Sequence, residues 1–164
     1  QINQLFGDMT VLESVALSVS ERLGLGASWF KPLAAHGEAV DEAAVILQRL
    51  GLLSDAYETT RNLAYGRQRL IEIALALAQR PKVLLLDEPA AGVPTSESRE
   101  LFEVIAQLPR DVTILLIEHD MDLVFRFAER ISVLVSGALL LEDTPEVIAN
   151  HPRVREVYLG EAHG

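Results

Sequence analysis

Two acidic side chains stand together where an apolar run of the chain ends. Asp87 and Glu88 follow the four residues Val83–Leu86, and so short an apolar run is typical of a buried strand. Mg²⁺ prefers carboxylate and water oxygens. One carboxylate of such a pair can hold the ion through water while its neighbour orients an attacking water. The pair is therefore a candidate site for phosphoryl chemistry, although an acidic pair alone is more often a solvated strand end.

A second apolar run, Thr113–Ile117, ends just before His119. A helix is expected between the two runs, from Ser96 to Leu108, and strand, helix, strand at this spacing predicts parallel pairing through a right-handed crossover. We expect both strands to be buried on both faces. Because ligands bind beyond the carboxyl ends of parallel strands, the acidic pair and His119 are predicted to lie along one edge.

A third candidate is the segment Leu63–Gln68, at the mouth of a long helix expected from about Gly66 to Gln79. Unpaired backbone N–H groups at a helix start make an anion site. Gly66 would let a phosphate approach the backbone closely. The alternative is an ordinary helix entry with a glycine N-cap.

The elements before this segment are expected to be helical. Thr10 and Glu13 form a predicted capping box that starts a helix, and a second amphipathic helix is expected from Glu38 to Leu50. A loop is expected between them, from Ala27 to Gly37. Residues 1–80 are thus predicted to be a helical subdomain that carries the Leu63–Gln68 segment.

Residues 81–164 are predicted to be an α/β subdomain. After the two strands, a helix is expected from Met121 to Glu129. Ser136-Gly137 is a hairpin turn signal between strands 131–135 and 138–141. Pro145 is expected at the first position of a short helix.

Composition excludes several classes of protein. The 164 residues carry a formal net charge of -10 and no basic cluster, which argues against a nucleic-acid partner. There is no cysteine, so disulfides and thiolate metal sites are excluded. The apolar runs are too short to span a bilayer. The chain does not begin with Met, and we interpret it as a fragment.

The order of LAYGRQ, VLLLDEP and ILLIEHD along the chain resembles the ABC ATPase family. The first corresponds to the signature motif, the second to the Walker B strand, and His119 to the switch histidine. The opening QINQLFGDMTVLESV resembles the segment that begins with a glutamine sensing the metal and the transmembrane partner, here Gln1. LAYG, DEPAAG and IEHDM resemble most closely the subunits that drive branched-chain amino acid uptake.

The resemblance implies ATP and Mg²⁺ as cofactors and assigns roles. Asp87, together with Gln1, would help to hold Mg²⁺, Glu88 would polarise the attacking water, and His119 would contact the γ-phosphate. Two subunits would sandwich two nucleotides, and each would present its signature segment to the other's ATP. The signature residues that would bind in this way are Ala64, Tyr65, Gly66, Arg67 and Gln68.

Three departures from the family pattern are visible. Ala64 stands where the signature usually has Ser, and Pro94 stands where the loop after Walker B usually has Asp or Asn. No G-x-x-x-x-G-K-[ST] phosphate loop occurs in these residues. The expected fold is therefore α/β, a partial P-loop NTPase sheet without its phosphate-loop strand, with a helical subdomain.

The resemblance also implies partners and a location. The full-length parent would hydrolyse ATP at the cytoplasmic face of the membrane, bound to transmembrane permease subunits, and import amino acids. The fragment alone is expected to be inactive and to self-associate. Two alternatives stay open, an ABC ATPase that acts outside transport and a non-catalytic interaction module.

Overall fold

The structure is a computed structural model that describes residues 5–25 and 37–158. These fall into two compact units, residues 1–117 and 118–164. The predicted boundary between residues 80 and 81 follows motif content rather than compactness, and it stays a prediction. Gln1 and nearly all of the predicted loop 27–37 lie outside the described residues.

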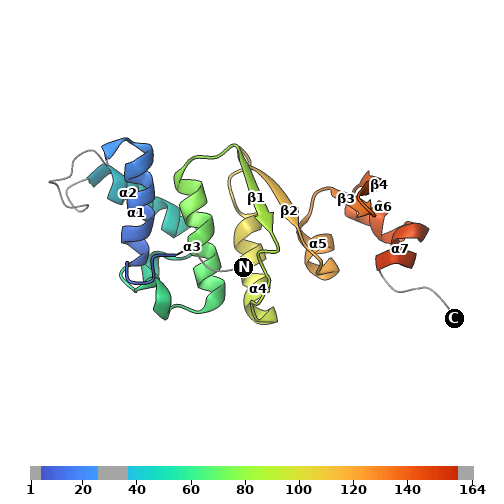
Figure 1. The fold of residues 1–164 in the computed structure, drawn as a ribbon, viewed down its shortest axis with the longest axis horizontal. Coiled ribbons are helices and arrows are strands. Elements are labelled where there is room, and N and C mark those ends of the chain that lie inside the picture. Colours follow the sequence, from blue (N-terminus) through green and yellow to red (C-terminus); the bar gives the residue numbers. More distant parts are fainter. Residues whose placement is uncertain (1–4, 26–36, 159–164) are drawn as a thin grey trace. The chain divides into compact units, whose positions relative to one another are not determined.

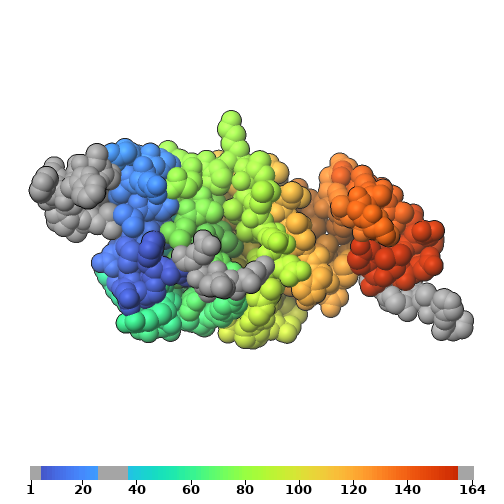
Figure 2. Space-filling view, viewed as in Figure 1, coloured from blue at the N-terminus to red at the C-terminus, as the bar shows by residue number. Residues whose placement is uncertain are grey.

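Three helices form most of the first unit: α1 (Val11–Arg22), α2 (Gly37–Arg49) and α3 (Tyr65–Ala78). Figure 1 shows them side by side, and in Figure 2 the blue atoms of α1 lie directly against the green atoms of α3. The predicted capping box is confirmed, since the Thr10 hydroxyl accepts from the Glu13 N–H and the Glu13 carboxylate accepts from the Thr10 N–H. Val15 and Val19, one helical turn apart, are fully buried in the shared core.

An acidic side chain of α2 ties the ends of these helices together. Glu42 accepts from Arg22 of α1 at 2.6 Å and from Arg80, just after α3, at 3.0 Å. The Arg22 Nε also donates to the carbonyl of Ala78, the last residue of α3, at 2.7 Å. Burial raises the pKa of Glu42, but the hydrogen bonds and charges of Arg80 and Arg22 outweigh it and leave the pKa below its ordinary value.

Two short 3₁₀ turns, η3 (Leu53–Asp55) and η4 (Thr60–Asn62), lead into α3. A single antiparallel bridge joins Thr59 to Thr10, beside the start of α1. The Thr60 N–H donates to the Met9 carbonyl and its hydroxyl to the Phe6 carbonyl. The approach to α3 is therefore fixed by the chain just before α1.

The predicted strand, helix, strand unit is present. Strand β1 (Val83–Asp87) pairs in parallel with β2 (Thr113–Ile117), and helix α4 (Thr95–Ala106) connects them. In this register Asp87 stands beside Ile117, so both strands end at the same edge. Helix α4 also packs against α3, which brings its first turn to the start of that helix.

The expectation that both faces of these strands are buried is wrong. Leu84, Leu86 and Ile114 pack into the core that includes residues of α3 and α4. On the opposite face Leu85 is 69% exposed and Ile117 is 59% exposed. Helices of the described chain cover one face of the sheet, and the apolar residues of the other face face outwards.

The second unit contains α5 (Met121–Phe127), strands β3 (Ile131–Val135) and β4 (Ala138–Asp143), and helices α6 (Pro145–Asn150) and α7 (Pro152–Tyr158). The predicted hairpin is confirmed: β3 and β4 pair antiparallel, and both turn residues have positive φ, 51° at Ser136 and 78° at Gly137. Helix α5 is two residues shorter than expected, and α7 was not predicted. The strands β3 and β4 form a sheet separate from that of β1 and β2.

Candidate functional site

The acidic pair lies at a strained end of β1. Asp87 is the last residue of the strand and is exposed, and Glu88 follows it with φ of 45°. A non-glycine residue in this left-handed region is uncommon, and such strain gathers at functional sites. The Glu88 N–H donates to the Ile117 carbonyl of β2 at 2.8 Å. This bond extends the parallel ladder by one step and holds the acidic pair at the strand end.

The chain after Glu88 turns back towards the signature segment. The Ala91 N–H donates to the Glu88 carbonyl and the Val93 N–H to the Ala90 carbonyl, each at 3.0 Å. Gly92 has φ of 76°, and a Cβ there would lie 3.4 Å from the Tyr65 ring. The loop that follows the acidic pair therefore passes close to the ring of Tyr65, the first residue of α3.

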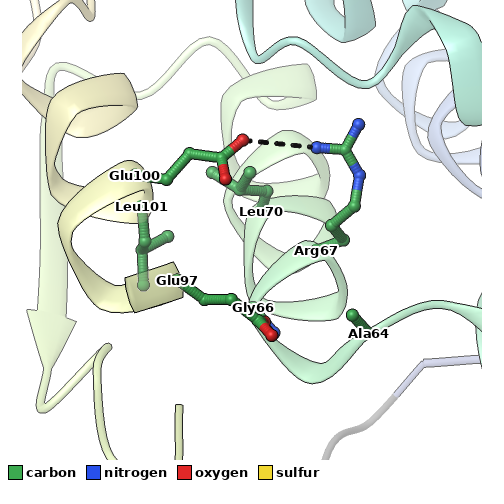
Figure 3. Close-up of a pocket in the computed structure, with 7 residues that line it drawn as sticks. All are labelled: Ala64, Gly66, Arg67, Leu70, Glu97, Glu100 and Leu101. Carbon is green, nitrogen blue, oxygen red and sulfur yellow. Dashed lines mark hydrogen bonds and ion pairs between the residues drawn. The ribbon is translucent and has the colours of Figure 1, made fainter. Parts of the chain in front are cut away.

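The signature segment opens α3 without a capping side chain of its own. Ala64 is the N-cap, so the alternative of a glycine N-cap is wrong, and its methyl group accepts no hydrogen bond. Gly66 lies in the first turn and is buried. Its N–H donates to the Glu97 Oε2 of α4 at 3.2 Å (Figure 3). One of the amides that the sequence assigns to a phosphate thus already holds an anion from the same chain.

The other signature side chains bind within their own unit. The Arg67 Nε donates to Asp55 at 2.6 Å, and its Nη2 donates to the Gly51 carbonyl at 3.0 Å. The Gln68 Nε2 donates to the Leu63 carbonyl at 2.9 Å. Arg69, one turn on from Tyr65, donates to the Tyr65 hydroxyl and stacks over its ring. These contacts fix the entry into α3 and the position of the Gly66 amide.

A cavity of about 120 Å³ lies beside this contact. Arg67 and Glu100 approach each other to 3.7 Å, and Glu97, on the same helix as Glu100, reaches towards Gly66 (Figure 3). Leu70, Leu101 and Ala64 complete the lining. Glu97 and Glu100 were not among the residues identified from sequence. The only local signal for Glu97 is its place in the first turn of α4, which indicates an ordinary helix start.

His119 belongs to the second unit, two residues beyond the end of β2. Its N–H donates to the Glu118 carboxylate at 3.1 Å, and its side chain is 74% exposed. The next residue, Asp120, caps α5 by accepting from Asp122 and Leu123. The predicted meeting of His119 with Asp87 and Glu88 stays a prediction, and Gln1 lies outside the described residues.

Asp87 suits a magnesium ion only in part. Among the described residues there is no group of three or more acidic or histidine side chains placed to hold a metal. An exposed carboxylate at a strand end nevertheless fits Mg²⁺, which keeps several waters and commonly takes the rest of its oxygens from the substrate's phosphates. The donor set therefore fits a metal that arrives together with a nucleotide.

Among the described residues, no helix combines the length and the apolar character needed to cross a membrane.

The fold and the motifs together are those of the ATP-binding cassettes of the ABC class. Residues 1–91 match the family model described as "ABC transporter", and the chain belongs to that family. Residues 138–164 match a second model, "Branched-chain amino acid ATP-binding cassette transporter".

Relatives with curated names agree with this family. The chain is 46% identical over 166 residues to the high-affinity branched-chain amino acid transport ATP-binding protein LivG of Salmonella typhimurium, covering 97% of this chain and 65% of that protein. It is 41% identical to BraF of Pseudomonas aeruginosa, a protein of the same description, over the same shares. The chain thus spans about 65% of the length of these relatives.

Solved structures give the same fold. The ADP conformation of an ATP-binding cassette of an ABC transporter matches with a TM-score of 0.75 and 28% identity, over 98% of this chain and 66% of that one. A nucleotide-free ATP-binding cassette matches with a TM-score of 0.75 and 29% identity, over 98% and 67%. The expected α/β fold of a P-loop NTPase is confirmed.

Proposed function

We propose that this chain is part of the ATP-binding subunit that energises the import of branched-chain amino acids through a membrane permease. The observation that carries the proposal is the 46% identity to LivG over 97% of the chain, with the signature, Walker B and switch motifs in order. We call the longer protein that would contain this chain the parent protein. ATP hydrolysis and transport belong to it, and these 164 residues alone are expected to release no phosphate.

The roles of the residues follow from what their positions can do. Glu88, held at the end of β1, would accept a proton from the attacking water and orient it. His119 would donate to the γ-phosphate, since a neutral imidazole both donates and accepts. Asp87, together with Gln1, would hold Mg²⁺, which when bound neutralises charge on the phosphates.

The signature segment would serve the second nucleotide of a sandwich dimer. The start of α3 would present the backbone N–H groups of Tyr65, Gly66 and Arg67 to the γ-phosphate held by the partner subunit. Ala64 supplies no hydroxyl, so binding there would depend on backbone amides. The parent protein would dock on the permease at the cytoplasmic face of the membrane, as a peripheral subunit.

Reconstituted transport tests the proposal. The parent protein would be purified with its permease, placed in proteoliposomes with ATP on the subunit's side, and supplied with labelled leucine and its binding protein. We expect ATP-dependent leucine uptake that unlabelled isoleucine or valine inhibits and lysine does not. Failure to co-purify with any permease would favour an ABC ATPase outside transport. ATP-driven uptake of a different solute would refute the substrate class only.

A further inference from the structure

We propose that Glu97 is an internal blocking group of the signature segment: its carboxylate occupies the Gly66 amide in the separated subunit and must leave before the partner's γ-phosphate can bind there. The proposal rests on the proposed function, because it needs a nucleotide that approaches Gly66 from a second subunit. It adds a competing anion that belongs to this chain.

The contact between Glu97 and Gly66 is a hydrogen bond from a backbone amide to a carboxylate. The Gly66 N–H and the Glu97 Oε2 are 3.2 Å apart, and the oxygen would lie 2.8 Å from a Cβ at Gly66. The carboxylate therefore fills the space directly over the residue where a phosphate oxygen would have to sit. A single N–H cannot serve both anions at full strength, and two negative groups at one helix start also repel each other.

The start of α3 is a favourable position for the Glu97 carboxylate. The first turn of α3 contains no acidic side chain, and its N-cap, Ala64, supplies no oxygen. Glu97 comes from a different helix, 31 residues further along the chain. Its carboxylate therefore takes the place of a capping Ser or Asp side chain, because it accepts a hydrogen bond from an N–H of the first helical turn.

The surroundings allow the carboxylate to move. Glu97 lines the 120 Å³ cavity together with Arg67, whose guanidinium lies there beside Glu100 (Figure 3). A rotation of the Glu97 side chain into this cavity would release the Gly66 N–H and bring the carboxylate towards a cation. Glu97 lies three residues after Pro94, and its own N–H donates to the Pro94 carbonyl at 2.9 Å. A shift of the loop after Glu88 would therefore reach Glu97 directly.

The first experiment needs no nucleotide. The Gly66 amide would be followed by NMR in this chain while inorganic phosphate is added, in the unmodified chain and in Glu97→Ala and Glu97→Gln variants. We expect phosphate to shift the Gly66 resonance in Glu97→Ala at concentrations at least about fivefold lower than in the unmodified chain, with Glu97→Gln between them. Equal responses in all three would overturn the proposal.

The second experiment measures ATP-driven dimerisation of the parent protein in a Glu88→Gln background, with thermal unfolding as a check on folding. Removing the blocking carboxylate should lower the ATP concentration at half dimerisation by about three- to tenfold in Glu97→Ala, even though the variant loses a helix cap and melts earlier. Glu103→Ala, on the same helix and exposed, removes the same charge away from Gly66 and should leave that concentration within twofold.

The outcomes separate the two proposals. If Glu97 only stabilises the helix start, Glu97→Ala will need more ATP than the unmodified protein, and the blocking role is refuted. If the ATP requirement is unchanged, the blocking role is likewise refuted, while the proposed function stands. If no form of the parent protein dimerises with ATP, the proposed function fails and this proposal fails with it, whatever the phosphate titration shows of the Gly66 amide.

Discussion

Glu88 combines a strained backbone, with φ of 45°, with a carboxylate placed directly after the end of β1. We predict that Glu88→Gln in the parent protein slows ATP hydrolysis by at least about a hundredfold, in line with the usual contribution of a general base. ATP should still bind, because the change keeps the size of the side chain and its backbone bond to Ile117. Phosphate release and gel filtration with ATP would show a slow enzyme that accumulates as a dimer.

Glu103→Gln, an exposed change of the same kind on α4, is the matched control and should turn over normally. A Glu88→Gln protein that stays monomeric with ATP and hydrolyses it at the ordinary rate would remove Glu88 from its role.

Gly66 has a structural task that sequence reasoning did not include. A Cβ there would meet the Glu97 Oε2 at 2.8 Å and the Glu97 Cβ at 3.2 Å, so the Glu97 carboxylate would have to swing away and α4 would have to shift by a few tenths of an ångström. We predict that Gly66→Ala lowers the free energy of unfolding by about 1–3 kcal/mol, the usual cost of overpacking, measured by urea unfolding of this chain. Gly37→Ala, where no atom lies within 4 Å of the new methyl group, should be neutral or stabilising by up to about 1 kcal/mol. Equal free energies of unfolding for the two variants would show that α3 and α4 accommodate the added methyl group without cost.

The candidate residues could be identified from motif order, but their contacts could not. Asp87 and Glu88 follow an apolar run, and parallel pairing places them at an edge whatever the rest of the fold does. The contact of Glu97 with Gly66 depends on how α4 packs against α3, which no local pattern encodes. The same holds for Arg67, whose partner Asp55 lies in a 3₁₀ turn that the sequence did not predict.

At the scale of helices and strands, the predictions that the structure confirms came from short local motifs in the sequence. Thr10 with Glu13 fixed the start of α1, and Ser136-Gly137 supplied the positive φ that a two-residue hairpin needs. The error over β1 and β2 has a physical cause. Leu84 and Leu85 are equally apolar, yet one is buried and the other is exposed, because apolar character does not say which elements are present to cover each face.

The ion pairs of Glu42 with Arg22 and Arg80 make the stability of the helical part of the first unit depend on pH. The depressed pKa of Glu42 means that its contribution to stability is complete above the ordinary value of 4.5 and is lost as the pH falls through the lower, folded-state value. We predict that Glu42→Gln costs about 1 kcal/mol of unfolding free energy at pH 7. The difference from the unmodified chain should shrink as the pH falls below 4.5.

Chemical unfolding at pH 7, 5 and 3.5 would measure this trend. Glu38→Gln, an exposed change in the first turn of the same helix, should alter stability by less than about 0.5 kcal/mol. A Glu42→Gln penalty that stays constant across these pH values would show that the ion pairs with Arg22 and Arg80 do not carry the effect.

At the scale of the whole molecule, motif order predicted the family and part of its sheet. It could not predict how residues 118–164 would divide from the rest, because compactness depends on packing between elements far apart in the chain. The outward face of β1 and β2 carries Val83, Leu85, Leu115 and Ile117, each more than half exposed. Contiguous apolar surface of this kind favours association, and open strand edges recruit further strands.

We predict that this chain self-associates in solution, by strand addition or by exchange of its C-terminal segment between two copies. Its weight-average mass, measured by light scattering over a hundredfold range of concentration, should rise with concentration. Leu85→Lys places a charge on the outward face of β1 and should raise the dissociation constant by at least about tenfold, since burying a charge there costs more than 1.4 kcal/mol. Leu53→Lys, at a leucine that is also exposed but lies in η3, should leave it unchanged. A strictly monomeric chain at every concentration would show that the apolar face tolerates water, and equal effects of the two lysines would place the contact elsewhere on the molecule.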